Sequence, residues 1–147
     1  MKHLNKLILG FIAIAALTAC QSNDPSNDFA NKLADKFIDA VNNSKYDEAF
    51  TMVEPEFFGV RAKDQWIEYY DAVKKEMGPI ISIKLSRSLT DNRLSGRFYM
   101  YQYSIKHENG FTKEMVTMIK KINNNDPLKI AGHKIDSSKL LKINERY

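Results

Sequence analysis

Apolar and polar residues alternate with helical spacing in the segment from residue 29 to residue 41. Apolar side chains recur every three or four positions there, and Lys and Asp residues occupy the positions between them. Pro25, directly after Asp24, is a helix-start signal just upstream. The pattern predicts an amphipathic helix whose apolar face holds Phe29, Ala30, Leu33, Ala34, Phe37, Ile38 and Val41.

Two further helices are expected after a turn near residues 42–45. The first is short, it is stopped by Pro55, and its apolar face holds Tyr46, Ala49, Phe50 and Val53. The second runs from about Lys63 to Met77, because Trp66, Tyr70, Val73 and Met77 recur at helical spacing. Gly78 and Pro79 end this helix, since glycine closes helices and proline cannot continue them.

From residue 80 onward the pattern becomes that of strands. The expected strands are 80–89, 93–107, 113–122 and 128–136, with turns at 108–110 and around 123–127. Helices followed by antiparallel strands predict an α+β fold. We expect N-terminal helices packed on a curved antiparallel sheet of about four strands, with one sheet face buried and the other in water.

Several stretches resemble small exported bacterial domains of the nuclear-transport-factor-2-like, or cystatin-like cone, superfamily. They are KYDEAF, QWIEYY, MGPIISIKLSRSL, GRFYMYQYSIKHENG, KEMVTMIKK and LKIAGHKI. The likeness spans roughly residues 30–136. It implies a cone fold with no assigned activity, and it leaves a homodimer through the open sheet face as an option. The family usually has a tryptophan at the position of Leu128 and an aromatic residue at that of His133, differences that bear on sheet packing.

The N-terminus has the layout of a secretory signal. Lys2 and Lys6 precede an apolar run from Leu7 to Leu17. This run has about 11 residues, whereas a membrane-spanning helix needs about 20. A permanent transmembrane anchor is therefore not expected.

The run ends in Leu17-Thr18-Ala19-Cys20, which holds the single cysteine of the chain. This stretch resembles the bacterial lipobox. The resemblance implies cleavage between Ala19 and Cys20, lipidation of Cys20 and attachment to membrane lipid through its acyl chains. Two or more chains anchor a protein stably, whereas one binds only marginally. Gln21 in place of Asp implies the outer membrane, facing the periplasm, in a Gram-negative cell.

Removal of residues 1–19 changes the length and the net charge of the chain. It leaves 147 − 19 = 128 residues, and the loss of Lys2 and Lys6 lowers the formal net charge from +4 to +2. No run of basic residues remains, so nucleic acid is not an expected partner. We expect residues 20–28 to form the lipidated cysteine and a polar tether. Residues 29–147 are then one domain.

Residues capable of catalysis or metal binding are few. His107 and His133 lie on different predicted strands without a metal-ligand spacing, so no metal or other cofactor is expected. There is no GxSxG motif. Some cone-fold relatives are isomerases that use a carboxylate and a tyrosine. The candidates for such a pair here are Asp71 or Glu114 with a strand tyrosine.

Aromatic residues are the candidates for a ligand pocket or a partner surface. Each group has two interpretations: a site, or packing under helices and at the open end of the cone. Phe57 and Phe58 are expected in an exposed loop between the second and third helices. The candidates are Trp66, Tyr70, Tyr99, Tyr101, Tyr103, Phe57 and Phe58.

These observations predict a membrane-anchored envelope lipoprotein whose domain binds a protein or a small ligand, without catalysis. An immunity or inhibitor lipoprotein is the alternative, and a protruding loop around 54–63 would favour it. An isomerase-like enzyme is the third interpretation. The last residues contain Leu140, Leu141 and Ile143, and the sequence leaves open whether they dock on the domain.

Overall fold

The computed structural model of the chain describes residues 25–122 and 125–147. Its elements, in chain order, are α1 (Pro25–Asn42), α2 (Tyr46–Thr51), the 3-10 helix η1 (Pro55–Gly59), α3 (Lys63–Met77), β1 (Ile80–Arg93), β2 (Gly96–His107), β3 (Gly110–Lys121), β4 (Lys129–Asp136), the 3-10 helix η2 (Ser138–Leu140) and α4 (Leu141–Arg146). The predicted α+β class is confirmed. Cys20, Ala19 and the predicted signal segment lie outside the described residues.

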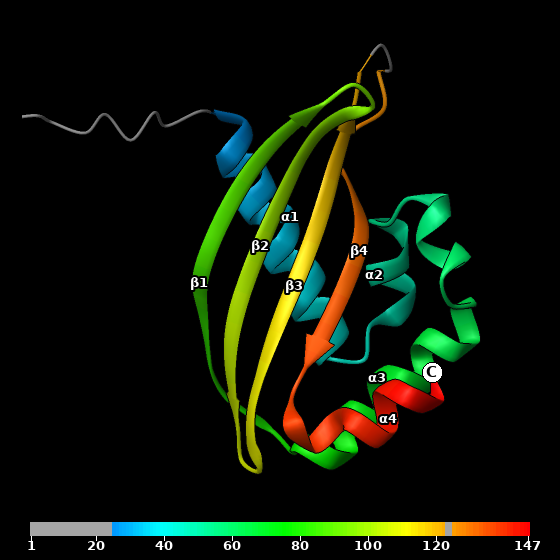
Figure 1. Cartoon of the computed structure of the whole chain (residues 1–147), viewed down its shortest axis with the longest axis vertical. Coiled ribbons are helices and arrows are strands. Elements are labelled where there is room, and N and C mark those ends of the chain that lie inside the picture. Colours follow the sequence, from blue (N-terminus) through cyan, green and yellow to red (C-terminus); the bar gives the residue numbers. More distant parts are fainter. Residues whose placement is uncertain (1–24, 123–124) are drawn as a thin grey trace, which may run out of the picture.

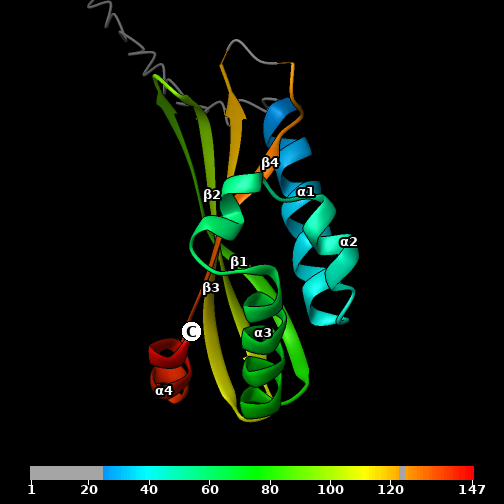
Figure 2. The same ribbon diagram turned by 90° about the vertical axis from the view of Figure 1, so that its right-hand side faces the viewer.

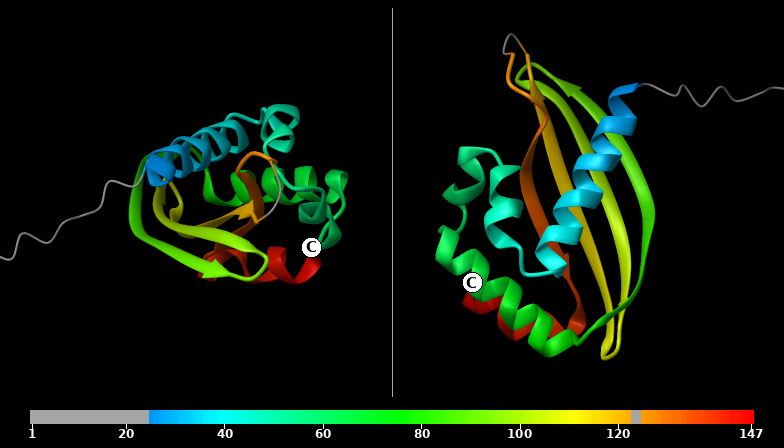
Figure 3. Two further views of the ribbon diagram at one scale, coloured as in Figure 1. Left: turned by 90° about the horizontal axis from the view of Figure 1, so that it is seen from above. Right: turned by 180° about the vertical axis from the view of Figure 1, so that it is seen from behind.

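The four strands form one sheet in the order β1-β2-β3-β4, and each strand is antiparallel to the next. In β1 the register shifts between Ile80 and Ser82 and again between Leu85 and Arg87. Such irregularities bend a strand and increase its twist. The sheet curves along its length, and α1 lies across its hollow side (Figures 1 and 3).

The buried apolar stripe of helix α1 is narrower than predicted. Ala30, Ala34, Phe37 and Ile38 are buried, but Phe29 is 55% exposed. The helix repeats every 3.6 residues, so a row of positions four apart drifts by about 40° at each step. The predicted row that starts at Phe29 therefore turns away from the core, and the expectation of a buried Phe29 is wrong. The helix also begins at Pro25, four residues before the expected start of the domain.

The hollow face of the sheet carries the tyrosines of β2. Tyr99, Tyr101 and Tyr103 are each 2% exposed. The Tyr101 hydroxyl donates to the backbone carbonyl of Asn27 over 3.3 Å, and the Tyr103 hydroxyl donates to Asp35 Oδ1 over 2.9 Å. These tyrosines therefore pack under α1, which is one of the two interpretations of the pattern.

Between α2 and α3 the chain forms η1 rather than an exposed loop. Phe57 is 2% exposed and stacks on Trp66, with ring centres 4.6 Å apart. The expectation that Phe57 is exposed is wrong, because η1 turns this ring into the aromatic cluster beneath α3. Phe58 is half-buried and packs edge-on against Phe50. Helix α3 has the predicted bounds, and Gly78, with a φ of 72°, closes it.

The C-terminal residues dock on the domain. Leu140 is fully buried, and Tyr69 on α3 donates its hydroxyl proton to Asn144 Oδ1 over 3.0 Å. Helix α4 lies close to α3 near the lower end of the sheet (Figure 2). The sequence leaves open whether these residues dock on the domain. In the structure Leu140 does, whereas Leu141 is 62% exposed.

The outer face of the sheet and most of β1 are open. Leu89, Phe111 and Met115 are exposed at 46%, 61% and 38%. Phe111 and Met115 alternate with the buried positions of β3, and Leu89 lies opposite Met100, between the buried Tyr99 and Tyr101 of β2, so all three point away from α1. Pairing of two copies through this face stays a prediction.

Candidate functional site

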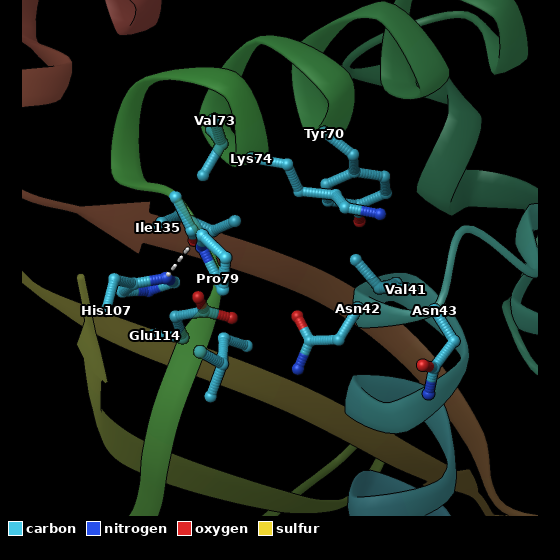
Figure 4. Close-up of a pocket in the computed structure, with 12 residues that line it drawn as sticks. Val41, Asn42, Asn43, Tyr70, Val73, Lys74, Pro79, His107, Glu114 and Ile135 are labelled. Atoms are coloured by element: carbon cyan, nitrogen blue, oxygen red, sulfur yellow. Dashed lines mark hydrogen bonds between the residues drawn. The ribbon is translucent and has the colours of Figure 1, made fainter. Parts of the chain in front are cut away.

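A cleft of about 470 Å³ opens where the end of α1, the end of α3 and the start of β1 meet. Figure 4 shows side chains from both helices and from the sheet directed toward this space. Its apolar lining is Val41, Val73, Pro79, Ile80 and Ile135, and its polar lining includes Asn42, Asn43, Tyr70, Lys74, His107 and Glu114. Apolar walls with a few fixed polar groups are typical of small-molecule sites.

The strand register brings Glu114 and His133 together. Glu114 in β3 lies opposite Tyr103 in β2 and Ile135 in β4, and all three are buried. His133 lies two residues from Ile135 and therefore points to the same side of the sheet. The alternation along β3 and β4 thus directs a carboxylate and an imidazole into the hollow side of the sheet.

A hydrogen-bonded chain runs from α3 to β3. The Tyr70 hydroxyl lies 3.0 Å from His133 Nδ1, and His133 Nε2 lies 3.1 Å from Glu114 Oε2. The three side chains come from three different elements, and all are buried. Because a carboxylate only accepts, Nε2 donates to Glu114 when Glu114 is ionised, and in a neutral His133 ring Nδ1 then accepts the hydroxyl proton of Tyr70.

The chain continues from Glu114 to the end of β2. Thr112 Oγ1 donates to Glu114 Oε1 over 3.1 Å, and His107 Nε2 lies 3.0 Å from Thr112 Oγ1. His107 Nδ1 lies 3.2 Å from the carbonyl oxygen of Gly78, a contact drawn as a dashed line in Figure 4. A carbonyl only accepts, so Nδ1 carries a proton.

This geometry allows two arrangements of the protons in the chain. If Thr112 donates to an ionised Glu114, then Nε2 of His107 must donate to Thr112, and His107 carries both ring protons. If His107 is neutral, Thr112 donates to it instead, and Glu114 must carry a proton to donate to Thr112. The two arrangements contain the same number of protons and differ by a shift along Glu114, Thr112 and His107.

Tyr70 stays neutral in this environment. Burial, followed by the nearby charge of Glu114, raises the pKa of Tyr70 well above its usual value. Its ring stacks on Trp66 and Tyr46, with centres 5.3 Å and 5.9 Å away. Phe37 packs edge-on against His133 at 5.2 Å. The polar chain is therefore held inside an aromatic shell.

Two groups of residues that line the cleft have unused hydrogen-bonding capacity. The side-chain amide nitrogen of Asn42 is buried and has no hydrogen-bond partner among the described residues. Glu114 uses one contact on each oxygen, and a carboxylate has about four lone-pair positions, so it can accept further hydrogen bonds. Lys74 lines the same cleft and contacts Ser44 Oγ through its ammonium group. The cleft thus offers both a donor and an acceptor.

Of the residues predicted for a pocket or partner surface, Tyr70 lines this cleft, and the other six do not. Trp66 and Phe57 line a separate hollow of about 380 Å³ together with Arg61. The guanidinium carbon of Arg61 lies 4.3 Å from the Trp66 ring centre and 4.2 Å from that of Tyr69.

Asp71 and Glu114, the two candidate carboxylates for acid–base chemistry, lie in different environments in the structure. Asp71 is exposed and accepts a hydrogen bond from the hydroxyl of Tyr46. Glu114 is buried at the cleft, but its tyrosine partner through His133 is Tyr70 on a helix, not a strand tyrosine. The tyrosine that is hydrogen-bonded to Glu114 through His133 is therefore on a helix, and the expectation of a strand tyrosine in this role is wrong.

The sequence around the two histidines shows no metal-ligand spacing. His133 does more than fill the place of an aromatic residue in the sheet, since it joins Tyr70 to Glu114. Among residues 25–122 and 125–147, no group of three or more His, Cys, Asp and Glu side chains is placed to hold a metal ion. Within the same ranges, no helix is long and apolar enough to cross a membrane.

Comparisons with known proteins bear on the fold alone. No protein-family model matches the chain, and no curated protein matches it. The solved structure of Bdellovibrio bacteriovorus Bd1075 is similar, with a TM-score of 0.54 at 12% sequence identity. The match covers 78% of this chain but 42% of the Bd1075 chain, so this protein corresponds to less than half of that structure.

Proposed function

We propose that the protein is a lipid-anchored envelope protein of the cone-fold superfamily that binds a small ligand in the cleft floored by Glu114. The observation that carries the binding proposal is the buried, unpartnered amide nitrogen of Asn42 in the same cleft as the Glu114 carboxylate. An unsatisfied buried donor costs stability, and a ligand acceptor would remove that cost. Lipidation of Cys20 is carried by the lipobox resemblance.

The lining defines the class of ligand. Val41, Val73 and Ile135 offer contact to an apolar body, while Glu114 accepts a hydrogen bond from an N–H or O–H group. Asn42 donates to an acceptor atom of the ligand. A small amphipathic molecule that carries both a donor and an acceptor at one end, such as an amide or a hydroxy acid amide, satisfies these groups together.

Ligand-observed NMR tests this proposal. A set of small amphipathic amides, amines, alcohols and carboxylates is screened for saturation transfer from the protein. Hits are then repeated with Glu114→Gln and Asn42→Ala. Lys113→Gln is the matched control, because Lys113 is the exposed neighbour of Glu114 in β3. We expect amide hits that both cleft variants weaken and the control retains.

A second outcome concerns catalysis. Glu114 and Tyr70 both line the cleft, and this observation favours the isomerase-like interpretation over other enzyme classes. The same NMR samples distinguish the two, because turnover changes the ligand spectrum over hours whereas binding does not. The inhibitor alternative receives no comparable support, because Phe57 in η1 is buried and the backbone N–H of Glu54 is bonded to Ile130.

A further inference from the structure

Three large apolar side chains are exposed at one end of the domain. Leu94, in the turn between β1 and β2, is 103% exposed, Ile122 after β3 is 54% exposed, and Phe29 near the start of α1 is 55% exposed. We name these three residues the apolar rim. Single exposed apolar residues are ordinary, but a group of them at one end marks an interaction surface.

Contacts in the structure place the three residues at the same end. Gly96 lies opposite Lys121 in the sheet, and the backbone N–H of Ile122 donates to the carbonyl of Ser95 over 3.5 Å. Phe29 lines a small hollow with Tyr99, Lys120, Pro127 and Leu128. Figures 1 and 2 show the β1–β2 turn, the end of β3 and the start of α1 together at the upper end of the molecule.

The length of chain before α1 connects this end to the membrane. Helix α1 begins at Pro25, and Cys20 lies five residues earlier. Five residues extend over about 18 Å at most. Acyl chains on Cys20 would therefore hold the upper end of the domain within this distance of the lipid surface.

We propose that the apolar rim contacts the lipid bilayer, so that the end of the domain drawn at the top of Figure 1 faces the membrane. This proposal rests on the lipidated Cys20 of the proposed function. Helix α1 has 18 residues and is about 27 Å long, and the cleft lies at its far end beside Asn42. The ligand cleft then lies about one helix length from the rim.

Two basic residues near the rim are paired with carboxylates. Arg93 pairs with Asp91 over 2.7 Å, and Lys121 pairs with Glu54 over 2.7 Å and with Glu56 over 3.4 Å. Leu94, Ile122 and Phe29 carry no charge, so their contact with lipid does not require anionic headgroups. The contact is therefore expected in neutral phosphatidylcholine and in high salt.

The single cysteine allows a direct test. Acylation blocks the thiol of Cys20, so Leu94→Cys, Ile122→Cys or Glu108→Cys each gives one free thiol in the mature lipoprotein. Glu108 lies in the exposed turn between β2 and β3 at the opposite end and is the control site. Each variant is checked for acylation by intact mass, labelled with an environment-sensitive fluorophore and reconstituted in phosphatidylcholine vesicles.

Quenching by lipids brominated in their acyl chains reports contact with the bilayer. We expect quenching at positions 94 and 122 at least about threefold stronger than at 108, unchanged in high salt. Equal and weak quenching at all three positions in acylated protein overturns the rim contact and leaves the anchor intact. A label at 94 that is buried but not quenched shows a protein partner and also overturns it. A mass without acyl chains overturns the anchor itself.

Discussion

His133 Nε2 lies 3.1 Å from Glu114 Oε2, and both side chains are buried. The pair joins Tyr70 on one side to Thr112 and His107 on the other. A buried carboxylate with hydrogen-bonded partners stabilises a fold mainly because its removal leaves those partners unsatisfied.

Glu114→Ala is therefore expected to lower the free energy of unfolding by about 3 kcal/mol, since His133 and Thr112 both lose an acceptor. Glu114→Gln keeps one acceptor oxygen and is expected to cost less. Urea denaturation measures both, with Lys113→Ala as the exposed control, expected within about 0.5 kcal/mol of the wild type. A Glu114→Ala protein as stable as this control would show that the chain of hydrogen bonds contributes little.

The C-terminal residues are expected to be part of the cooperative fold. Leu140→Ala removes a fully buried side chain and is expected to cost about 3 kcal/mol of unfolding free energy. Leu141→Ala, one residue later and 62% exposed, is the matched control and is expected to change little. If both variants unfold at the same urea concentration, the tail does not contribute to stability.

Gly96 allows the close approach of β2 to β3 at the β1–β2 turn. A Cβ atom there would lie 2.6 Å from the carbonyl oxygen of Lys120, and its φ is 159°. Gly96→Ala is expected to destabilise the domain by about 2 kcal/mol. A Cβ at Gly59 meets no atom within 4 Å, so Gly59→Ala is expected to be nearly neutral. Thermal unfolding of the two variants compares them, and equal midpoints would contradict the steric argument.

Buried tyrosines make the fold sensitive to alkaline pH. Burial raises the pKa of Tyr46 and of Tyr69 to about 12, and the hydrogen bond to Asp71 adds to the effect at Tyr46. In the unfolded chain tyrosine titrates near 10, so the unfolded state loses its protons first. Stability is therefore fully present below about pH 10 and falls as the pH rises toward 12.

Urea midpoints from pH 8 upward measure this loss, and absorbance at 295 nm follows tyrosine ionisation. Tyr69→Phe cannot ionise at this position and is expected to reduce the alkaline loss of stability. An unchanged pH dependence in this variant would assign the loss to other groups. Tyr69 also donates to Asn144, so the comparison is made with each protein's own stability at pH 8.

Local patterns were sufficient for most of the secondary structure. Helix α3 was predicted at its observed bounds, because helical spacing from Trp66 to Met77 ends at the Gly78-Pro79 stop. The exposure of Phe29 is not predicted by the sequence, and packing of Phe57 is one of two interpretations that the sequence leaves open. Both depend on where a helix contacts the sheet, which is a tertiary property that the spacing of apolar residues does not contain.

The candidate site was the least predictable part. The sequence predicts Tyr70 as a pocket residue and Glu114 as a candidate carboxylate for acid–base chemistry, but nothing in the sequence joins them. They meet through His133, and the three residues lie on α3, β3 and β4. His107 reaches the same chain through Thr112, five residues away in sequence but across a hairpin. Only the register of the sheet places these side chains on one inner face.

Native mass spectrometry of the protein purified from its own membranes, beside Glu114→Gln, tests the account most directly. The account predicts a chain that begins at Cys20 and carries acyl groups. It also predicts a small non-covalent adduct in the wild type that the variant loses. A chain without acyl groups would contradict the anchor, and identical spectra of the folded wild type and variant would contradict the ligand cleft.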